Sequence, residues 1–251
     1  MQRYFIEEKK ENSSSRITIT GDDVHHISRV MRMKPGNEIV CCTADGFSAL
    51  CEIAELHEDA VVCSVREWQD ADNELPVKVT IASGLPKGDK LEWIFQKGTE
   101  LGASSFIPFN AARSVVKLDA KKAGKKADRW RKIVKEASEQ SYRNVIPDVS
   151  EPQSFKELLR LSESYDYKIA AYEESAKTGE MSNLAKVLQS CSPGQSVLAV
   201  FGPEGGLTKE ETEQLAAAGF NLCGLGPRIL RTETAPLYLL SAVSYHFELS
   251  R

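Results

Sequence analysis

The architecture of this chain of 251 residues can be read from two glycine-rich stretches, Leu225-Gly-Pro-Arg-Ile-Leu-Arg-Thr-Glu-Thr-Ala235 and Phe201-Gly-Pro-Glu-Gly-Gly-Leu-Thr208. Each stretch follows a short apolar run, 220–225 or 197–201, and each precedes a helical pattern. In an open α/β sheet, such loops at consecutive strand ends are the usual place for a ligand. Neither loop has the spacing of a dinucleotide or nucleoside triphosphate motif, so we expect a different ligand.

Strand and helix patterns alternate from residue 77 onward. Thr208 and Glu211 have the spacing of a capping box, and Pro236 fits only the first turn of the last helix. The alternation predicts a mostly parallel sheet covered on both faces, which is an α/β fold. The expected strands are 77–82, 104–109, 167–172, 197–201 and 220–225, and the expected helices include 89–101 and 125–142.

The first 70 or so residues have the pattern of a small β-rich domain with one helix. Asp22 or Asp23 can cap this helix, and its apolar face is predicted to hold Val24, Ile27, Val30 and Met31. The polar stretch 69–76 ends in proline and is typical of a linker. We therefore expect two domains, 1–72 and 73–251.

Three further motifs accompany the glycine-rich loops: His26-Ile-Ser-Arg-Val-Met-Arg-Met-Lys-Pro-Gly36, Lys97-Gly-Thr-Glu-Leu-Gly102 and Glu136-Ala-Ser-Glu-Gln-Ser-Tyr-Arg143. With these motifs in this order, the chain resembles the bacterial small-subunit rRNA uridine-N3 methyltransferases. The similarity extends over nearly the whole chain. That family belongs to the SPOUT, or trefoil-knot, class of S-adenosylmethionine enzymes. The resemblance implies a PUA-like β-barrel for 1–72, a knotted α/β methyltransferase domain for 73–251, 16S rRNA as substrate and a homodimer. Periodicity alone indicates no knot, and knots are rare.

The glycines of the two loops would let the main chain approach the adenine and ribose of S-adenosylmethionine closely, because no Cβ intervenes. Alternatively, they serve only the tight turns between strand and helix. On the resemblance, the cofactor (S-adenosylhomocysteine as product) is expected to contact Tyr172, Gly202, Glu204, Gly205, Gly206, Leu225, Gly226, Ile229 and Leu230.

Uracil N3 carries a proton in neutral uridine, so its methylation needs a base or a group that stabilises the anion. We assign Arg231 to the developing negative charge, with Glu233 orienting it or accepting the proton. The other interpretation of Glu233 is a favourable charge at the start of the last helix.

The net charge of −4 is distributed unevenly along the chain, with basic residues concentrated in one segment. Residues 113–143 hold 11 basic and 4 acidic residues, a balance of +7, whereas the rest of the chain carries −11. This pattern indicates either a face that binds a phosphate backbone or a solvated helix. The residues predicted to contact RNA are Arg3, Arg29, Arg32, Lys87, Arg113 and Arg143.

The remaining features narrow the class of protein. Charged residues interrupt the N-terminus, and no apolar run approaches the roughly 20 residues of a membrane span, so we expect a soluble cytoplasmic protein. The six cysteines form no CxxC pair and are predicted to be buried thiols, with no metal site.

Two alternatives to the uridine-N3 reaction stay open. One is a related methyltransferase acting on tRNA or a ribose 2′-hydroxyl, and the other is a non-catalytic RNA-binding assembly factor.

Overall fold

The computed structural model describes residues 1–13, 15–70, 73–116, 120–172 and 183–250. The chain forms two compact units. Unit 1 comprises Met1–Glu74 and Ser138–Ile146, and unit 2 comprises Leu75–Ala137 and Pro147–Arg251. The expected boundary between residues 72 and 73 lies close to the first crossing, although residues 71–72 are outside the described part. Sequence reasoning placed 138–146 in the second domain, whereas the contacts of these residues group them with unit 1.

Unit 1 is built on a curled five-stranded sheet with the strand order β1-β3-β4-β5-β2. The pairs are antiparallel except for β1 with β3. Register shifts between β4 and β5 are β-bulges, which bend a sheet and strengthen its twist. The strands are β1 (Arg3–Phe5), β2 (Arg16–Thr20), β3 (Glu38–Cys42), β4 (Ser48–Leu56) and β5 (Ala60–Gln69).

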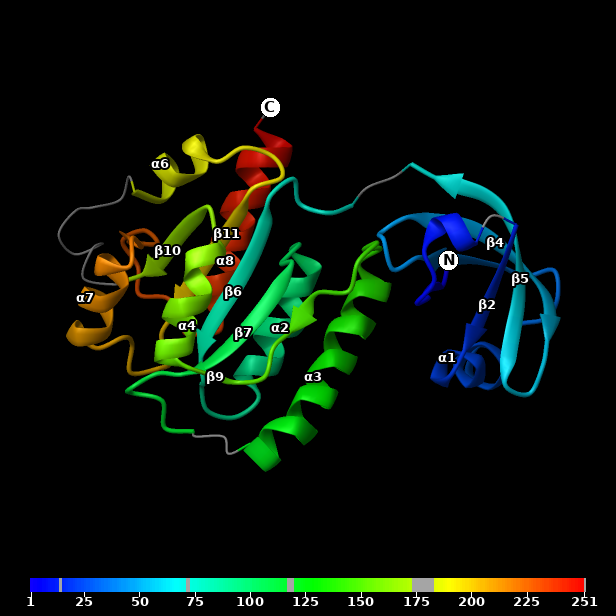
Figure 1. Ribbon diagram of the computed structural model, residues 1–251, viewed down its shortest axis with the longest axis horizontal. Helices are drawn as coiled ribbons and strands as arrows, with labels where there is room; N and C mark the ends of the chain where they lie inside the picture. The colour runs from blue at the N-terminus through cyan, green and yellow to red at the C-terminus, as the bar shows by residue number, and fades with distance from the viewer. Residues whose placement is uncertain (14, 71–72, 117–119, 173–182, 251) are drawn as a thin grey trace. The chain divides into compact units, whose positions relative to one another are not determined.

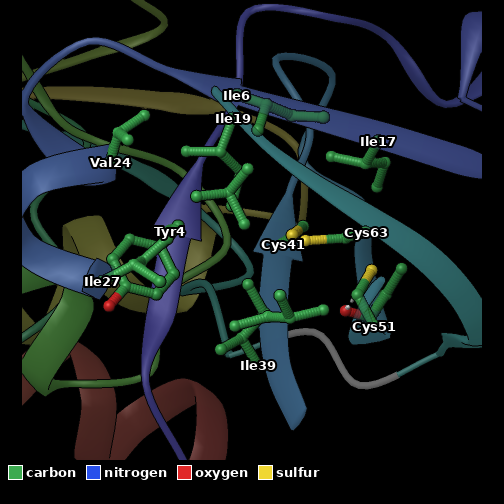
Figure 2. Close-up of a cluster of buried hydrophobic side chains, with 13 residues drawn as sticks. Tyr4, Ile6, Ile17, Ile19, Val24, Ile27, Ile39, Cys41, Cys51 and Cys63 are labelled. Atoms are coloured by element: carbon green, nitrogen blue, oxygen red, sulfur yellow. Dashed lines mark hydrogen bonds between the residues drawn. The ribbon is translucent and has the colours of Figure 1, made fainter. Parts of the chain in front are cut away.

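The core of unit 1 lies inside this sheet and is shown in Figure 2. It consists of aliphatic side chains, one tyrosine and thiols that alternate along the strands, as the period of a half-buried strand requires. All six cysteines of the chain are buried free thiols, as the sequence predicted. The labelled core residues are Tyr4, Ile6, Ile17, Ile19, Val24, Ile27, Ile39, Cys41, Cys51 and Cys63.

The one helical region of unit 1 differs from its prediction. Gly21, not an aspartate side chain, is the N-cap of α1 (Asp22–His25), which continues into a π-helical turn, η2 (His26–Val30). In this turn the amide of Met31 donates to the carbonyl of His26, five residues earlier. The wider turn rotates later residues away from the expected face, so Val30 and Met31 are exposed whereas Val24 and Ile27 are buried.

Unit 2 contains a seven-stranded sheet with the order β12-β10-β11-β6-β7-β8, and β9 also pairs with β7. Every pairing is parallel, so the carboxyl ends of all strands meet at one edge. Strands β6 to β9 extend the sheet toward one edge. The next strand in the chain, β10, lies on the other side of β6, and β11 then occupies the position between β6 and β10, so the strand order reverses at β6. The strands are β6 (Lys78–Gly84), β7 (Ser105–Asn110), β8 (Asp148–Val149), β9 (Gln153–Ser154), β10 (Tyr167–Ala171), β11 (Ser196–Phe201) and β12 (Asn221–Cys223).

Helices cover both faces of this sheet (Figure 1). On one face Ile107 and Phe109 pack in a cluster with Leu158 of α4 and Leu215 of α7. On the other, Phe106 packs on Phe95 of α2, whose neighbours are α8 and the Trp130 ring of α3. The helices are α2 (Lys90–Glu100), α3 (Ala120–Gln140), α4 (Phe155–Leu161), α6 (Asn183–Ser190), α7 (Lys209–Ala217) and α8 (Thr234–Ser244), with a π-helical end η4 (Tyr245–Leu249).

Several local predictions are confirmed. Thr208 and Glu211 form the capping box of α7, and Pro236 lies buried in the first turn of α8. The predicted strands are present, with ends that move by no more than a few residues. The short strands β8 and β9 and the helices α4 and α6 had not been predicted. In the described ranges, no helix is both long and apolar enough to cross a membrane.

Candidate active site

A cavity of about 670 Å³ opens in unit 2 at the carboxyl edge of the parallel sheet. Its walls come from the ends of β10 and β11 and from the two glycine-rich loops, which follow β11 and β12. The first turn of α2, the loop after β7 and the first turns of α7 and α8 complete the lining. A pocket of this size at the carboxyl edge of a parallel sheet is the expected place for a small-molecule ligand.

Two physical reasons explain the glycines of the loop after β11: close packing around their Cα atoms and, at one position, the backbone conformation. A Cβ on Gly202 would lie 2.7 Å from the carbonyl carbon of Gly206 and from the amide nitrogen of Leu207. A Cβ on Gly205 would lie 3.0 Å from the Cβ of Arg113. Gly206 has a φ of +69° and nothing within 4 Å of its Cβ position, so at this residue the backbone conformation demands glycine.

A lysine at the start of α2 connects the two loops electrostatically. The Lys90 ammonium donates a hydrogen bond of 2.8 Å to Oε1 of Glu204 and lies 3.7 Å from Oε2 of Glu233. The hydrogen bond to Glu204 raises the pKa of Lys90. Burial opposes ionisation of Glu204, but hydrogen bonds from Lys90 and from the Lys87 amide outweigh it and lower the pKa of that carboxyl. The Lys90 ammonium therefore lies between a carboxylate of each loop.

The two predicted catalytic side chains differ in exposure. Arg231 is 82% exposed at the mouth of the cavity, and its Nη1 lies 4.0 Å from Oε1 of Glu233. Glu233 is the N-cap residue of α8 but accepts no capping hydrogen bond, and only 22% of its side chain is exposed. Its Oε2 atom is buried and has no hydrogen-bond partner among the described residues. This oxygen lies 3.7 Å from the Lys90 ammonium, beyond hydrogen-bond distance, so the carboxylate keeps the capacity to accept a proton from a ligand.

The cavity brings together most of the residues that the sequence singled out. Every residue predicted for the cofactor lines it, as do Arg231 and Arg113. Glu233 lies beside the lining through its contacts with Lys90 and Arg231. Sequence reasoning missed Lys90 and Lys209, which also line it. The signal for Lys90 was present in the stretch 84–90, where Lys87 was chosen instead.

The residues predicted to contact RNA fall into three groups. Arg29, Arg32 and Lys87 are exposed. The Arg113 guanidinium donates 2.8 Å and 3.4 Å hydrogen bonds to the carbonyls of Gly205 and Leu207, so it supports the glycine-rich loop after β11.

Arg3 and Arg143 are buried, and their prediction as direct RNA contacts is corrected. Arg3 donates to the Arg143 carbonyl and to Oδ1 of Asn144. The Arg143 side chain is 3% exposed and forms an ion pair with Glu74. Both guanidinium groups therefore hold 138–146 against the rest of unit 1 instead of facing solvent.

Comparisons with known proteins agree with this architecture. A family model described as an RNA methyltransferase domain matches residues 73–244, and one described as an RNA methyltransferase PUA domain matches residues 19–66. The chain is 59% identical over 253 residues to ribosomal RNA small subunit methyltransferase E of Bacillus subtilis (strain 168), covering 100% of this chain and 99% of that protein.

Two solved structures are similar over nearly the whole chain. One is ribosomal RNA small subunit methyltransferase E from Neisseria gonorrhoeae bound to S-adenosyl methionine, with a TM-score of 0.83, 30% identity and 97% coverage of both chains. The other is a methyltransferase from Legionella pneumophila in complex with the same cofactor, with a TM-score of 0.78, 26% identity and 96% coverage of both chains. The expected α/β fold, a SPOUT-type knot domain after a PUA-like domain, is confirmed. With a family model over more than half its length and a relative 59% identical from end to end, this chain belongs to the RNA methyltransferase family that includes ribosomal RNA small subunit methyltransferase E.

Proposed function

We propose that the protein transfers a methyl group from S-adenosylmethionine to N3 of a uridine in 16S rRNA of the small ribosomal subunit. The observation that carries the proposal is the cavity bounded by both glycine-rich loops, with the exposed Arg231 in its lining and the Glu233 carboxylate beside it. The names of the relatives support 16S rRNA as the substrate, and two similar structures hold S-adenosylmethionine.

The residues present fit this cofactor. Close packing at Gly202 and Gly205 fixes the shape of the loop that lines the cavity, and the space beside Gly206 is open. Ile229 and Leu230 supply apolar walls suited to an adenine ring, and the Tyr172 side chain lines the same cavity. When bound, S-adenosylmethionine supplies an electrophilic methyl group on its sulfonium sulfur. The chain must then orient the target base and free the lone pair of its nitrogen.

Glu233 and Arg231 supply these two functions. The uridine N3 proton must leave before the nitrogen can act as a nucleophile, and the Glu233 carboxylate, whose Oε2 has no hydrogen-bond partner among the described residues, accepts it. The resulting negative charge spreads over the uracil ring, where the exposed Arg231 guanidinium stabilises it. The Lys90 ammonium, 3.7 Å from Oε2 of Glu233, balances the charge of that carboxylate.

Unit 1 contributes RNA affinity. Arg29 and Arg32 are exposed around the π-helical turn, where the apolar side chains of Val30 and Met31 are exposed as well. Cations and apolar groups together suit an RNA strand, because the cations contact phosphates and the apolar groups contact bases or sugars. Lys87 adds an exposed cation next to the glycine-rich loop of unit 2, since its amide bonds to Glu204.

The enzyme works as a homodimer that joins through the last helix. Exposed Tyr238, Tyr245 and Leu249 recur along α8 and η4 at spacings that place them on one side, and Trp93 is exposed on α2, which packs on α8. Such a run of large apolar side chains is typical of an interface. Tyr245→Glu is expected to convert the dimer into monomers, as measured by light scattering during gel filtration.

The test is methyl transfer from labelled S-adenosylmethionine to small subunits that lack the modification, followed by analysis of the digested nucleosides. We expect label in N3-methyluridine. Arg231→Ala should lower the rate by about a hundredfold to a thousandfold, the usual cost of losing a group that stabilises a transition-state anion. Its affinity for S-adenosylhomocysteine should change by only a few fold, because that charge acts mainly in the transition state.

Three results would contradict the proposal. Label in a ribose methyl group or in tRNA would assign a different substrate. Binding of the RNA without any transfer would indicate an assembly factor. Near-normal turnover by Arg231→Ala would leave that residue without the role given to it.

A further inference from the structure

Tyr142 adopts a backbone conformation that a tyrosine rarely takes. Its φ is +60°, in the left-handed region that favours glycine, and in the described chain only Arg32 shares this property among non-glycine residues. The conformation is held by the Asn73 side chain, whose amide donates a 2.8 Å hydrogen bond to the Tyr142 carbonyl. Yet the side chain that causes this strain is 50% exposed, so core packing does not explain why a tyrosine occupies the position.

A buried cation lies behind the tyrosine ring. The guanidinium carbon of Arg3 is 5.6 Å from the centroid of the Tyr142 ring. Arg3 is 6% exposed, and its hydrogen bonds go to neutral acceptors: the Cys42 thiol, the Arg143 carbonyl and Oδ1 of Asn144. Its Nε has no partner, and Arg3 forms no ion pair with the residues that the structure describes. Burying a charge without a counter-charge is costly, so the contact of this cation with a half-exposed ring calls for a role beyond its hydrogen bonds inside unit 1.

The arrangement suits a ring that stacks on a nucleobase. A cation over one face of an aromatic ring draws electron density toward itself, so the opposite face becomes a better partner for an electron-rich base. Unpaired RNA bases are commonly recognised by stacking on exposed aromatic side chains. We propose that Tyr142 is a stacking platform for an unpaired base of the RNA, with Arg3 as the positioning charge behind it. This inference rests on the proposed RNA substrate and adds a contact in unit 1 that is separate from the cavity of unit 2.

The decisive variant is Tyr142→Gly in the full-length protein. Glycine relieves the left-handed strain, so the melting temperature should stay the same or rise. Loss of one stacked base should nevertheless weaken binding to 16S rRNA by roughly 5-fold to 150-fold. Tyr142→Phe keeps the ring and should bind within about twofold of the unaltered protein, a limit well below that stacking loss. A residue with a purely structural role would not combine higher stability with lower affinity.

Phe47→Ala is the matched control. Phe47 is another exposed aromatic residue of unit 1, and the Lys10 ammonium lies 4.3 Å from the centroid of its ring. Unlike Arg3, however, Lys10 is not buried, and Phe47 does not have the left-handed backbone conformation of Tyr142. This variant should bind 16S rRNA like the unaltered protein. Affinity for S-adenosylhomocysteine, measured by calorimetry, should be unchanged in every variant because the cavity lies in unit 2.

The inference is overturned if Tyr142→Gly binds 16S rRNA as tightly as the unaltered protein, or if Phe47→Ala weakens binding equally. It is also overturned if the glycine variant binds free 16S rRNA normally but intact small subunits weakly, since the ring would then contact a ribosomal protein. If the unaltered protein binds neither 16S rRNA nor S-adenosylhomocysteine, the proposed function fails instead. The two failures are therefore distinguishable.

Discussion

The ammonium group of Lys90 donates a hydrogen bond of 2.8 Å to Oε1 of Glu204 and so ties the start of α2 to the glycine-rich loop after β11. The same ammonium lies 3.7 Å from Oε2 of Glu233, on the second glycine-rich loop. One cation between two carboxylates allows the loops to approach each other, because without it the two negative charges would repel.

Removing this cation is expected to disturb catalysis more than cofactor binding. In Lys90→Ala the two loops lose their shared partner, and a small displacement of Glu233 should lower the rate of methyl transfer by up to about a hundredfold. Lys90→Arg keeps a cation within reach and should restore most of the rate. Single-turnover transfer to small subunits measures the effect. Equal rates for Lys90→Ala and the unaltered enzyme would show that the pair with Glu204 is only a surface contact.

Gly202→Ala should distort the loop itself. The new methyl group would lie 2.7 Å from two main-chain atoms, so the backbone must move, at a cost of about 1–3 kcal/mol in unfolding free energy. Affinity for S-adenosylhomocysteine should fall with the loop geometry, as calorimetry can test. The control is Gly124→Ala in α3, where a Cβ meets nothing within 4 Å. That change should raise stability by roughly 0.5–1 kcal/mol and leave affinity unaltered.

The Glu74 carboxylate is predicted to be a major determinant of stability in unit 1. It accepts hydrogen bonds from Arg143 Nε and Nη2 and from the amides of Asn144 and Val145. Glu74→Gln removes the charge opposite a buried guanidinium, which typically costs about 3–5 kcal/mol. Urea unfolding would measure the loss. Glu52→Gln breaks the exposed pair with Arg66 and should cost at most about 1 kcal/mol. Similar losses in both variants would contradict the prediction.

Unit 1 should also lose stability in mild alkali through Cys42. Burial raises the pKa of this thiol from 9.0 to about 11, against an opposing effect of Arg3. Because the pKa is higher in the folded state, the stabilisation is complete below pH 9 and is lost as the pH rises from 9 to 11. The loss should reach about 2–3 kcal/mol. Cys42→Ala should flatten this part of the curve of unfolding free energy against pH, and an unchanged slope would assign the loss to other groups.

The features that sequence could predict are those encoded locally. The capping box at Thr208 and Glu211 and the position of Pro236 depend on a few neighbouring residues, and both are present in the structure. The residues predicted for the cofactor line one cavity because glycine-rich loops after parallel strands share one edge of the sheet. That they line the cavity follows from topology, whereas their role remains part of the proposal.

The features that sequence missed depend on contacts between distant residues. Val30 and Met31 have the spacing of a buried helical face, but one π-helical turn shifts them into solvent. Arg143 is a charged residue at the end of a basic segment, which is typical of an exposed contact. It is buried because it forms an ion pair with Glu74, which is far away in the chain. Lys90 gains its importance from carboxylates on two loops that the fold brings together.

The assignment of 138–146 to unit 1 has a consequence for the synthesis of the protein. Unit 1 is not finished when Glu74 leaves the ribosome, because Arg143 and Asn144 are still to be made. At a typical elongation rate, residue 146 follows residue 74 after roughly 4 to 14 s. During this interval the carboxylate of Glu74 and the guanidinium of Arg3 lack the partners that they have in the folded unit. We therefore expect the amino-terminal sheet to complete its folding only after residues 138–146 have been synthesised. By then, part of unit 2 has already been translated.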